Sequence, residues 1–459
     1  METITRQETI DVAYSADVCV VGGGPAGTCA ALAAARNGHR VIVIEQANCL
    51  GGIATSGLHG HISRYSSWGR NDERVVGGIA HEIAERVVKE DFGVYDGSQC
   101  DFEVEGMKFI LEKMVQETGN VKLLYYTQFS DVVRDGGRIT HAIIQSKSGR
   151  EAVSADMFID CTGDADVAAR AGVPFQMGRP KDERCQPMTL MFQIGGVDYP
   201  RLQQFRQEEY PEQYPGENSW HLTKLWEKAQ ANGDMEPFQK NVMGWWHTPT
   251  RPHQLGINFT HITDRSTVDV EDLTYATIEG RWQAYHTVNV YRKYVPGMED
   301  CWMSHTAAII GTRESRRIEG EYQITEQDLM EEREFGDSIG YGSFFIDVHC
   351  CDGPGMDEET WWPPTGFKYQ IPYRALLPKN LDNLLVAGRC ISSTHLALGS
   401  LRVMPQCMLE GEAAGVAAGM AVNTESAPRD IDVGRLQEVL REQDGIVSED
   451  DIKSSAERG

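Results

Sequence analysis

The sequence predicts an α/β fold, in which a discontinuous Rossmann-like dinucleotide-binding domain receives an inserted, mixed α+β substrate domain. Three observations predict it. A βαβ unit with the spacing G-x-G-x-x-G lies at residues 17–52. Two more apolar strands, at 155–162 and 384–387, each run into a turn that contains glycine. Between them lies a long, weakly periodic stretch rich in Trp, Tyr, His and Arg.

The N-terminal unit begins with the apolar run at 18–21, which predicts a buried strand. The glycines that follow allow a tight turn, a close approach of the backbone to a pyrophosphate and close packing of helix on strand; they are Gly22, Gly24 and Gly27. An Ala-rich helix is then expected from Pro25 to Arg36, with Ala26 in its first turn. Its free N–H groups and its dipole favour phosphate binding.

An acidic residue follows the second strand of this unit. The strand is expected at 41–44, and Glu45 at its end would accept hydrogen bonds from ribose hydroxyls and repel the 2′-phosphate of NADP. Gly51 and Gly52 complete the pattern E-x4-L-G-G. This pattern resembles that of glutathione-reductase-type flavoproteins, and together with its position near the N-terminus it favours FAD over NAD.

Further elements are expected along the chain from the periodicity of apolar residues. Helices are predicted at 77–90, 106–118 (with Phe109 turned inward), 404–420 and 430–442. Short strands are predicted at 121–127, 130–135 and 139–149, with a hairpin turn at Gly136-Gly137. The expected division is a dinucleotide-binding domain at 15–177 and 369–424, the substrate domain at 178–368, and a C-terminal helix and tail at 425–459.

Composition restricts the partners of the protein. The chain has 459 residues and a net charge of −25, so nucleic acid and anionic membranes are unfavourable partners. No run approaches the ~18–20 apolar residues of a membrane span, and residues 1–18 carry no apolar signal segment. The 11 cysteines are scattered without a C-x-x-C pair, which is typical of reduced thiols. We therefore expect a cytoplasmic protein, and a homo-oligomer stays open.

Several longer segments carry a resemblance to a known family. They are residues 51–58, 158–179, 186–192, 311–325, 369–378 and 383–418. In this order they resemble the bacterial FAD-dependent oxidoreductase family, related to fumarate-reductase and glutathione-reductase-type flavoproteins. The resemblance implies bound FAD and a redox reaction with a small molecule, but no single substrate.

The resemblance also implies roles for particular residues. It implies that the ADP part of FAD lies against Gly22, Gly24, Gly27 and Glu45, and its phosphates against Gly51 and Gly52. It implies further cofactor contacts at Thr162, Gly163, Asp164, Gly388 and Arg389. The helix that starts near Pro405 would direct its positive end toward the flavin.

Candidates for the chemistry are histidines and arginines. Histidine suits a base because its usual pKa of about 6.5 lies near working pH; the candidates are His59, His61, His349 and His395. The run 313–317 is either an anion site or a domain-interface network of salt bridges, and on a helix Glu314 could pair with Arg317. Arg313 or Arg402 would hold a substrate carboxylate. Asp347 and His349 suit a base and its orienting partner, and too few further ligands accompany them for a metal site.

Three functions remain open at the level of sequence. The leading expectation is a dehydrogenase or oxidase of a small hydroxylated or carboxylated substrate. The second is a reductase of an activated C=C bond, by analogy with fumarate reductases, in which an arginine donates the proton. The third is a flavoprotein that uses FAD structurally or without redox chemistry. No second βαβ fingerprint is visible, so we expect a separate electron donor or acceptor.

Overall fold

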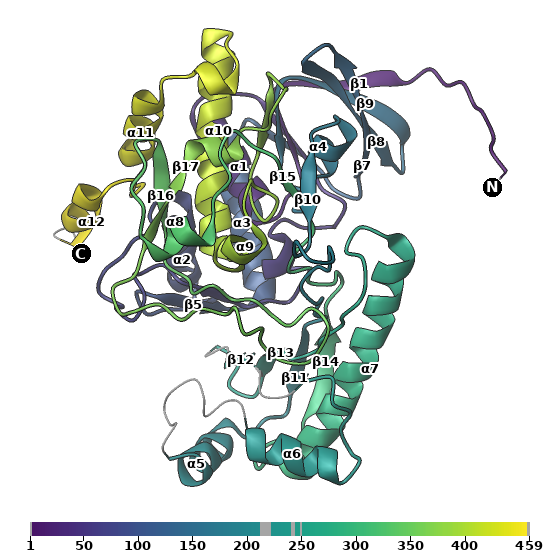
Figure 1. Cartoon of the computed structure of the whole chain (residues 1–459), viewed down its shortest axis with the longest axis vertical. Coiled ribbons are helices and arrows are strands. Elements are labelled where there is room, and N and C mark those ends of the chain that lie inside the picture. Colours follow the sequence, from purple (N-terminus) through teal and green to yellow (C-terminus); the bar gives the residue numbers. More distant parts are fainter. Residues whose placement is uncertain (1, 212–221, 240–243, 248–249, 457–459) are drawn as a thin grey trace.

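A seven-stranded sheet forms the centre of the computed structural model (Figure 1). The structure describes residues 2–211, 222–239, 244–247 and 250–456. Five strands run parallel, namely β6 (Val121–Leu124), β2 (Val41–Ile44), β1 (Asp11–Val21), β9 (Gly149–Asp160) and β18 (Leu384–Val386). β8 (Arg138–Ser146) and β7 (Gln128–Asp135) continue the sheet antiparallel. The C-terminal strand β18 thus lies against a strand more than 200 residues earlier in the sequence.

The alternation of apolar side chains explains how the sheet is covered. Val18 and Val20 of β1 pack into the core on one face, and Cys19 and Val21 pack into a separate cluster on the other. Residues 18–21 are all buried because both faces of the sheet are covered here. β2 has its predicted bounds, whereas β1 and β9 begin six or seven residues earlier than the apolar runs suggest.

Two helices pack closely on the face that carries Val18 and Val20. They are α1 (Pro25–Arg36), as predicted, and α10 (Met404–Thr424), with α2 (Gly78–Lys89) and α3 (Val104–Thr118) beside them. A Cβ at Gly411 or Gly415 of α10 would lie 2.0 Å from Ala26 O or 2.3 Å from Ala30 O. The small residues of the predicted 404–420 helix therefore allow two backbones to approach each other.

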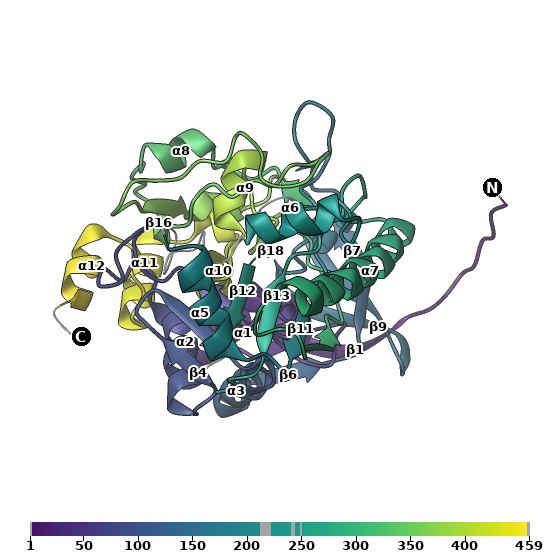
Figure 2. The same ribbon diagram turned by 90° about the horizontal axis from the view of Figure 1, so that it is seen from below.

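A second, smaller region lies at the lower end of the molecule in Figure 1 and nearest the viewer in Figure 2. Its antiparallel sheet has the order β12 (Gly244–His247), β13 (Leu255–Asn258), β11 (Phe192–Gly195), β14 (Trp302–Thr306). Helices α5 (Tyr199–Glu209), α6 (Thr223–Ala231) and α7 (Val270–Tyr294) accompany it. The fold is thus an α/β Rossmann-like fold with additional sheets, as predicted.

The rest of the described chain forms short elements. Three small sheets contain β3 (His61–Ser63), β5 (Gln99–Phe102) and β4 (Gly93–Tyr95); β10 (Phe175–Met177) and β15 (Arg316–Ile318); and β16 (Ser338–Gly342) and β17 (Tyr369–Pro372). The remaining α-helices are α4 (Asp166–Arg170), α8 (Glu326–Met330), α9 (His395–Leu401), α11 (Val433–Glu442) and α12 (Glu449–Ala456). Short 3-10 turns lie at Gly52–Ala54, Tyr373–Leu376 and Pro428–Asp430.

The structure corrects several expectations. Phe109 of α3 is 51% exposed rather than inward, because Ile110, Leu111 and Met114 already fill the buried face. The run 313–317 is not helical: it leads into strand β15, although Glu314 does pair with Arg317. Helix α7 was not expected, and the predicted tail carries the helix α12. No helix in the described ranges is both long and apolar enough to cross a membrane.

Candidate active site

A cavity of about 900 Å³ lies at the carboxyl ends of the parallel strands. Its lining includes residues at or just after the ends of four of them, namely Val21, Ile44, Cys161 and Ala387. The opposite wall comes from the smaller region and includes Met191, Trp245, Trp246 and Asn258. The position agrees with the rule that open α/β sheets bind ligands outside the carboxyl ends of their strands.

The glycine turn after β1 forms one end of this cavity. Gly22 has φ +97°, and a Cβ at Gly27 would lie 1.8 Å from Gly22 O, so both positions require glycine for the turn and for packing. A Cβ at Gly24, by contrast, would meet no protein atom within 4 Å. Gly22, Gly24, Pro25 and Ala26 all line the cavity. The open space at Gly24 and the free N–H groups at the start of α1 suit a pyrophosphate.

Glu45 and Gly51 hold the glycine turn in place through hydrogen bonds to Gly23. Glu45 Oε2 accepts a hydrogen bond from Gly23 N at 2.6 Å, and its Oε1 accepts one from Ala47 N at 2.7 Å. Burial raises the pKa of Glu45, and these backbone donors oppose the rise. Gly51 N donates to Gly23 O at 2.8 Å and lies outside the lining, whereas Glu45 and Gly52 belong to it.

An ion pair lies in the wall of the cavity. Arg389 Nη2 lies 2.8 Å from Asp164 Oδ1, and Arg389 Nη1 donates to Ser315 Oγ at 3.0 Å. Thr162, Gly163 and Gly388 line the cavity beside them. A cavity of about 900 Å³ lined by an open glycine turn, an acidic residue and a guanidinium fits FAD. The residues that would hold FAD are Gly22, Gly24, Pro25, Ala26, Glu45, Gly52, Thr162, Gly163, Asp164, Gly388 and Arg389.

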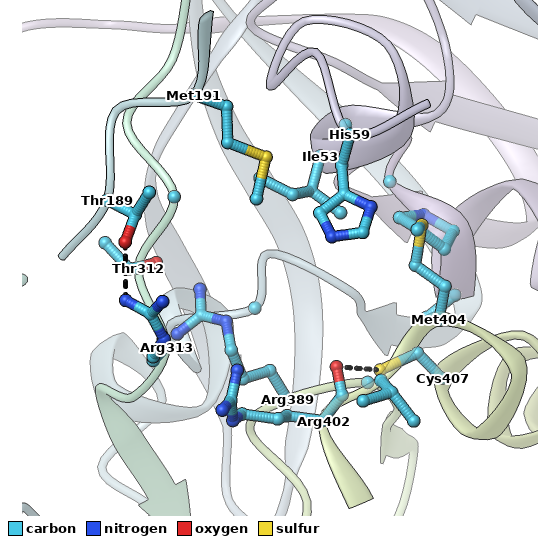
Figure 3. A pocket seen from close by; sticks show the side chains of 18 of the residues that line it. Ile53, His59, Thr189, Met191, Thr312, Arg313, Arg389, Arg402, Met404 and Cys407 are labelled. Atoms are coloured by element: carbon cyan, nitrogen blue, oxygen red, sulfur yellow. Dashed lines mark hydrogen bonds between the residues drawn. The ribbon is translucent and has the colours of Figure 1, made fainter. Parts of the chain in front are cut away.

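A buried cluster of charges occupies another part of the wall. Arg402 Nη2 donates to Asp347 Oδ2 at 2.9 Å, and His349 Nε2 lies 3.3 Å from Asp347 Oδ1. Arg313 donates to Pro187 O at 2.8 Å and to Thr189 Oγ1 at 2.6 Å. Figure 3 shows Arg313 and Arg402 on one side of the cavity and His59 across from them.

These contacts leave the cluster electropositive. Arg402 pairs with Asp347, whereas no carboxylate of the described residues lies within salt-bridge distance of Arg313. Burial and the charge of Arg402 lower the pKa of Arg313 to about 9. Burial opposes ionisation of Asp347, but the charges of His349 and Arg402 lower its pKa overall. The site therefore favours an anionic group.

Two histidines of the cavity, His59 and His349, are poor bases. Burial, with the nearby His61, lowers the pKa of His59 to about 3, and burial with the charge of Arg313 lowers that of His349 to about 4. His61 also lines the cavity, and its Nδ1 lies 2.5 Å from Asp101 Oδ1. A side chain whose pKa lies about three units below neutral pH holds a proton only weakly, so it is an inefficient general base.

Four predicted site residues lie outside the lining, namely Gly27, Gly51, Pro405 and His395. The first turn of α10 reaches the cavity through Met404 and Cys407 rather than through Pro405. His395 is buried, with Nδ1 2.9 Å from Glu314, which also pairs with Arg317. His395 therefore takes part in a buried network with Glu314 and Arg317 and does not line the cavity, and its expected role as a base stays a prediction. Arg316 and Arg317 likewise form ion pairs, whereas Arg313 alone in that run faces the cavity.

Several lining residues were not predicted. Thr189, Met191 and Trp246 come from the smaller region, and Trp68, Phe345 and Trp362 come from two loops. Thr189 and Met191 lie in the segment 186–192 that carries the family resemblance, and Trp246, Phe345 and Trp362 lie in the aromatic middle of the chain, whereas Trp68 had no signal of its own. Within the described ranges, no group of three or more His, Cys, Asp or Glu side chains is placed to hold a metal ion.

Comparisons with known proteins complete this description. The profile of the family described as FAD dependent oxidoreductase matches residues 17–440. A digeranylgeranylglycerophospholipid reductase of Methanopyrus kandleri is 29% identical over 165 residues, which cover 32% of this chain and 37% of that protein. The chain therefore matches little more than a third of that relative's length.

Solved structures are similar only at a distance. A geranylgeranyl bacteriochlorophyll reductase-like protein from Thermoplasma acidophilum is 12% identical, with a TM-score of 0.46 over 94% of this chain and 84% of that one. p-Nitrophenol 4-monooxygenase from Pseudomonas putida is 11% identical, with a TM-score of 0.43 over 95% and 84%. Such values transfer no activity to this chain.

Proposed function

The chain belongs to the FAD-dependent oxidoreductase family, and we propose that it reduces an activated carbon–carbon double bond in a substrate that carries a carboxylate. FAD is the cofactor of the family, and when bound it supplies the hydride equivalent. The protein's own part is to bind the carboxylate, to orient the double bond and to deliver a proton.

The observation that carries this proposal is the state of Arg313. Its side chain is buried and faces the cavity, and its pKa of about 9 makes it a stronger acid than an ordinary arginine while leaving it protonated at neutral pH. Proton donation by a positioned side chain typically contributes 10²–10⁴-fold, roughly, to a rate. Arg402, oriented by Asp347, is the partner suited to hold the substrate carboxylate.

The opposite direction, dehydrogenation of an alcohol or amine, has less support. It needs a base that accepts a proton near neutral pH, and the low pKa values of His59 and His349 do not suit that role. The 29% identical relative carries the name of a reductase, which agrees with the proposed direction.

The proposal is tested by mixing dithionite-reduced holoenzyme with but-2-enoate without oxygen. We expect the enoate to reoxidise the flavin, so that its absorbance near ~450 nm returns. In the Arg313→Gln variant the rate of this reoxidation should be at least about 100-fold lower. Arg435→Gln, on the exposed surface of α11, is the matched control and should behave as wild type. FAD content and Tm of each variant exclude a folding defect. Bleaching of the oxidised enzyme by a hydroxy acid, with no reoxidation by any enoate, would contradict the proposal.

A further inference from the structure

Four aromatic side chains form one connected surface in the cavity wall, which we call the aromatic shelf: Trp68, Phe344, Phe345 and Trp362. The rings of Phe345 and Trp362 are stacked, with centroids 4.1 Å apart and planes at 9°. Trp68 meets Phe345 edge-on at 5.5 Å. The other contacts of the shelf are edge-to-face or tilted, and such contacts fix ring orientation.

The shelf is accessible and held in place. Trp362 is 56% exposed although it lines the cavity, so one side of its indole remains open. The neighbouring Trp361 pairs with Ile346 through two backbone hydrogen bonds of 3.1 Å. The Arg64 guanidinium lies 4.4 Å from the Trp68 ring centroid on the same stretch of wall. A large apolar surface that stays exposed at a cavity is typical of a binding site.

The shelf lies beside the charged cluster. Phe345 precedes Asp347 by two residues, and both line the cavity. Two residues of chain span at most about 7 Å, so Phe345 lies close to Asp347 along the chain. Asp347 in turn orients Arg402. Ser400 Oγ of α9 donates to Phe344 O at 2.5 Å, which fixes this segment against the helix that precedes Arg402. An aromatic surface and an anion site thus share one short segment of wall.

We propose that the substrate carries a flat aromatic ring in addition to its carboxylate, as in a 3-arylpropenoate, and that the ring stacks on the aromatic shelf. This inference rests on the proposed function for the enoate part only. Stacking on Trp362 and Phe345 would favour a planar π-system over an aliphatic chain of equal size, because aromatic pairs gain energy beyond the area they bury.

The test measures binding without turnover. Oxidised holoenzyme is titrated calorimetrically with 3-phenylpropanoate, nonanoate and butanoate, of which the first two have equal carbon number. We expect 3-phenylpropanoate to bind at least about tenfold more tightly than the other two. In Trp362→Ala the preference for 3-phenylpropanoate over butanoate should fall about tenfold. Trp282→Ala is the matched control, because Trp282 of α7 is also 56% exposed and lies outside the cavity lining.

Three results would overturn the inference. Equal binding of nonanoate and 3-phenylpropanoate would mean that the shelf recognises apolar area and not a ring. Loss of FAD or a changed flavin spectrum in Trp362→Ala would mean that the shelf holds the cofactor. An unchanged preference in that variant would remove the shelf from binding. None of the three ligands carries an activated double bond, so their binding can be interpreted even if the enzyme does not reduce enoates. Enoate reduction can likewise be interpreted even if the ring does not bind on the shelf.

Discussion

Gly24 and Gly27 of the first turn are required to be glycine for different physical reasons. A side chain at Gly24 meets no protein atom and would extend into the cavity, whereas a side chain at Gly27 would collide with Gly22 O. We therefore expect Gly24→Val to lose at least about tenfold in FAD affinity with the fold retained, because only the bound pyrophosphate needs that space. Flavin absorbance after purification and a Tm measured on stripped protein check this.

Gly27→Val is the informative contrast for that experiment. Its Cβ would lie 1.8 Å from a backbone oxygen, so we expect loss of folding and not merely of cofactor. Full flavin content in Gly24→Val would show that no dinucleotide passes along this turn.

At the residue scale, the spacing of residues in the sequence predicted which residues line the dinucleotide part of the cavity better than which residues are placed for the chemistry. The glycines and Glu45 have fixed positions within one βαβ unit, so their placement follows from local geometry. Arg313 and His395 were equally plausible in the sequence, but the first faces the cavity and the second lies buried against Glu314. Which of two polar residues reaches a cavity depends on tertiary packing, which spacing does not encode.

At the scale of elements, helix α10 buries an acidic side chain. Glu412 is 3% exposed, its Oε2 accepts a hydrogen bond from Ile79 N at 2.8 Å, and burial raises its pKa from 4.5 to about 8. The folded protein therefore binds this proton more tightly than the unfolded chain. Its contribution to stability is complete below pH 4.5 and is lost as pH rises to about 8.

We expect Glu412→Gln to remove this pH dependence, because an amide stays neutral and still accepts from Ile79 N. The variant should gain stability over wild type as pH rises from 5 to 9, by up to about 5 kcal/mol. Tm measured across this range checks it, with the exposed Glu358→Gln as control. A Tm difference that is the same at pH 5 and pH 9 would show that Glu412 is charged throughout.

Helices and strands were predicted well where the apolar pattern follows burial. α1, α2 and β2 match their predicted bounds to within one residue. α7 was missed because apolar side chains lie on both of its faces. Its exposed face carries Tyr275, Ile278, Trp282 and Tyr285, and its buried face mixes Val288 and Tyr291 with Gln283 and Thr287. Periodicity indicates a helix only where apolar residues gather on one face.

At the scale of the whole molecule, the cavity joins segments that the sequence keeps far apart. Its charged cluster combines Arg313, Asp347 and Arg402. Figure 3 shows His59 across from the two arginines, and Trp246 stacks on His59. The family resemblance placed β18 and α10 beside the N-terminal unit in advance. The position of the smaller region's sheet against this cavity depends on packing between segments that showed little periodicity, and it could be seen only in the structure.

The central claim is that Arg313 donates the proton, and the pH profile of enoate reduction by wild-type holoenzyme tests it most directly. A donor must be protonated, so with a pKa of about 9 the rate should be level near neutral pH and fall as pH rises through about 9. Reoxidation of the reduced enzyme by but-2-enoate, followed at the flavin band between pH 6 and 10.5, gives this profile. A rate that instead falls between about pH 5 and 7 would assign the proton to a histidine and contradict the account.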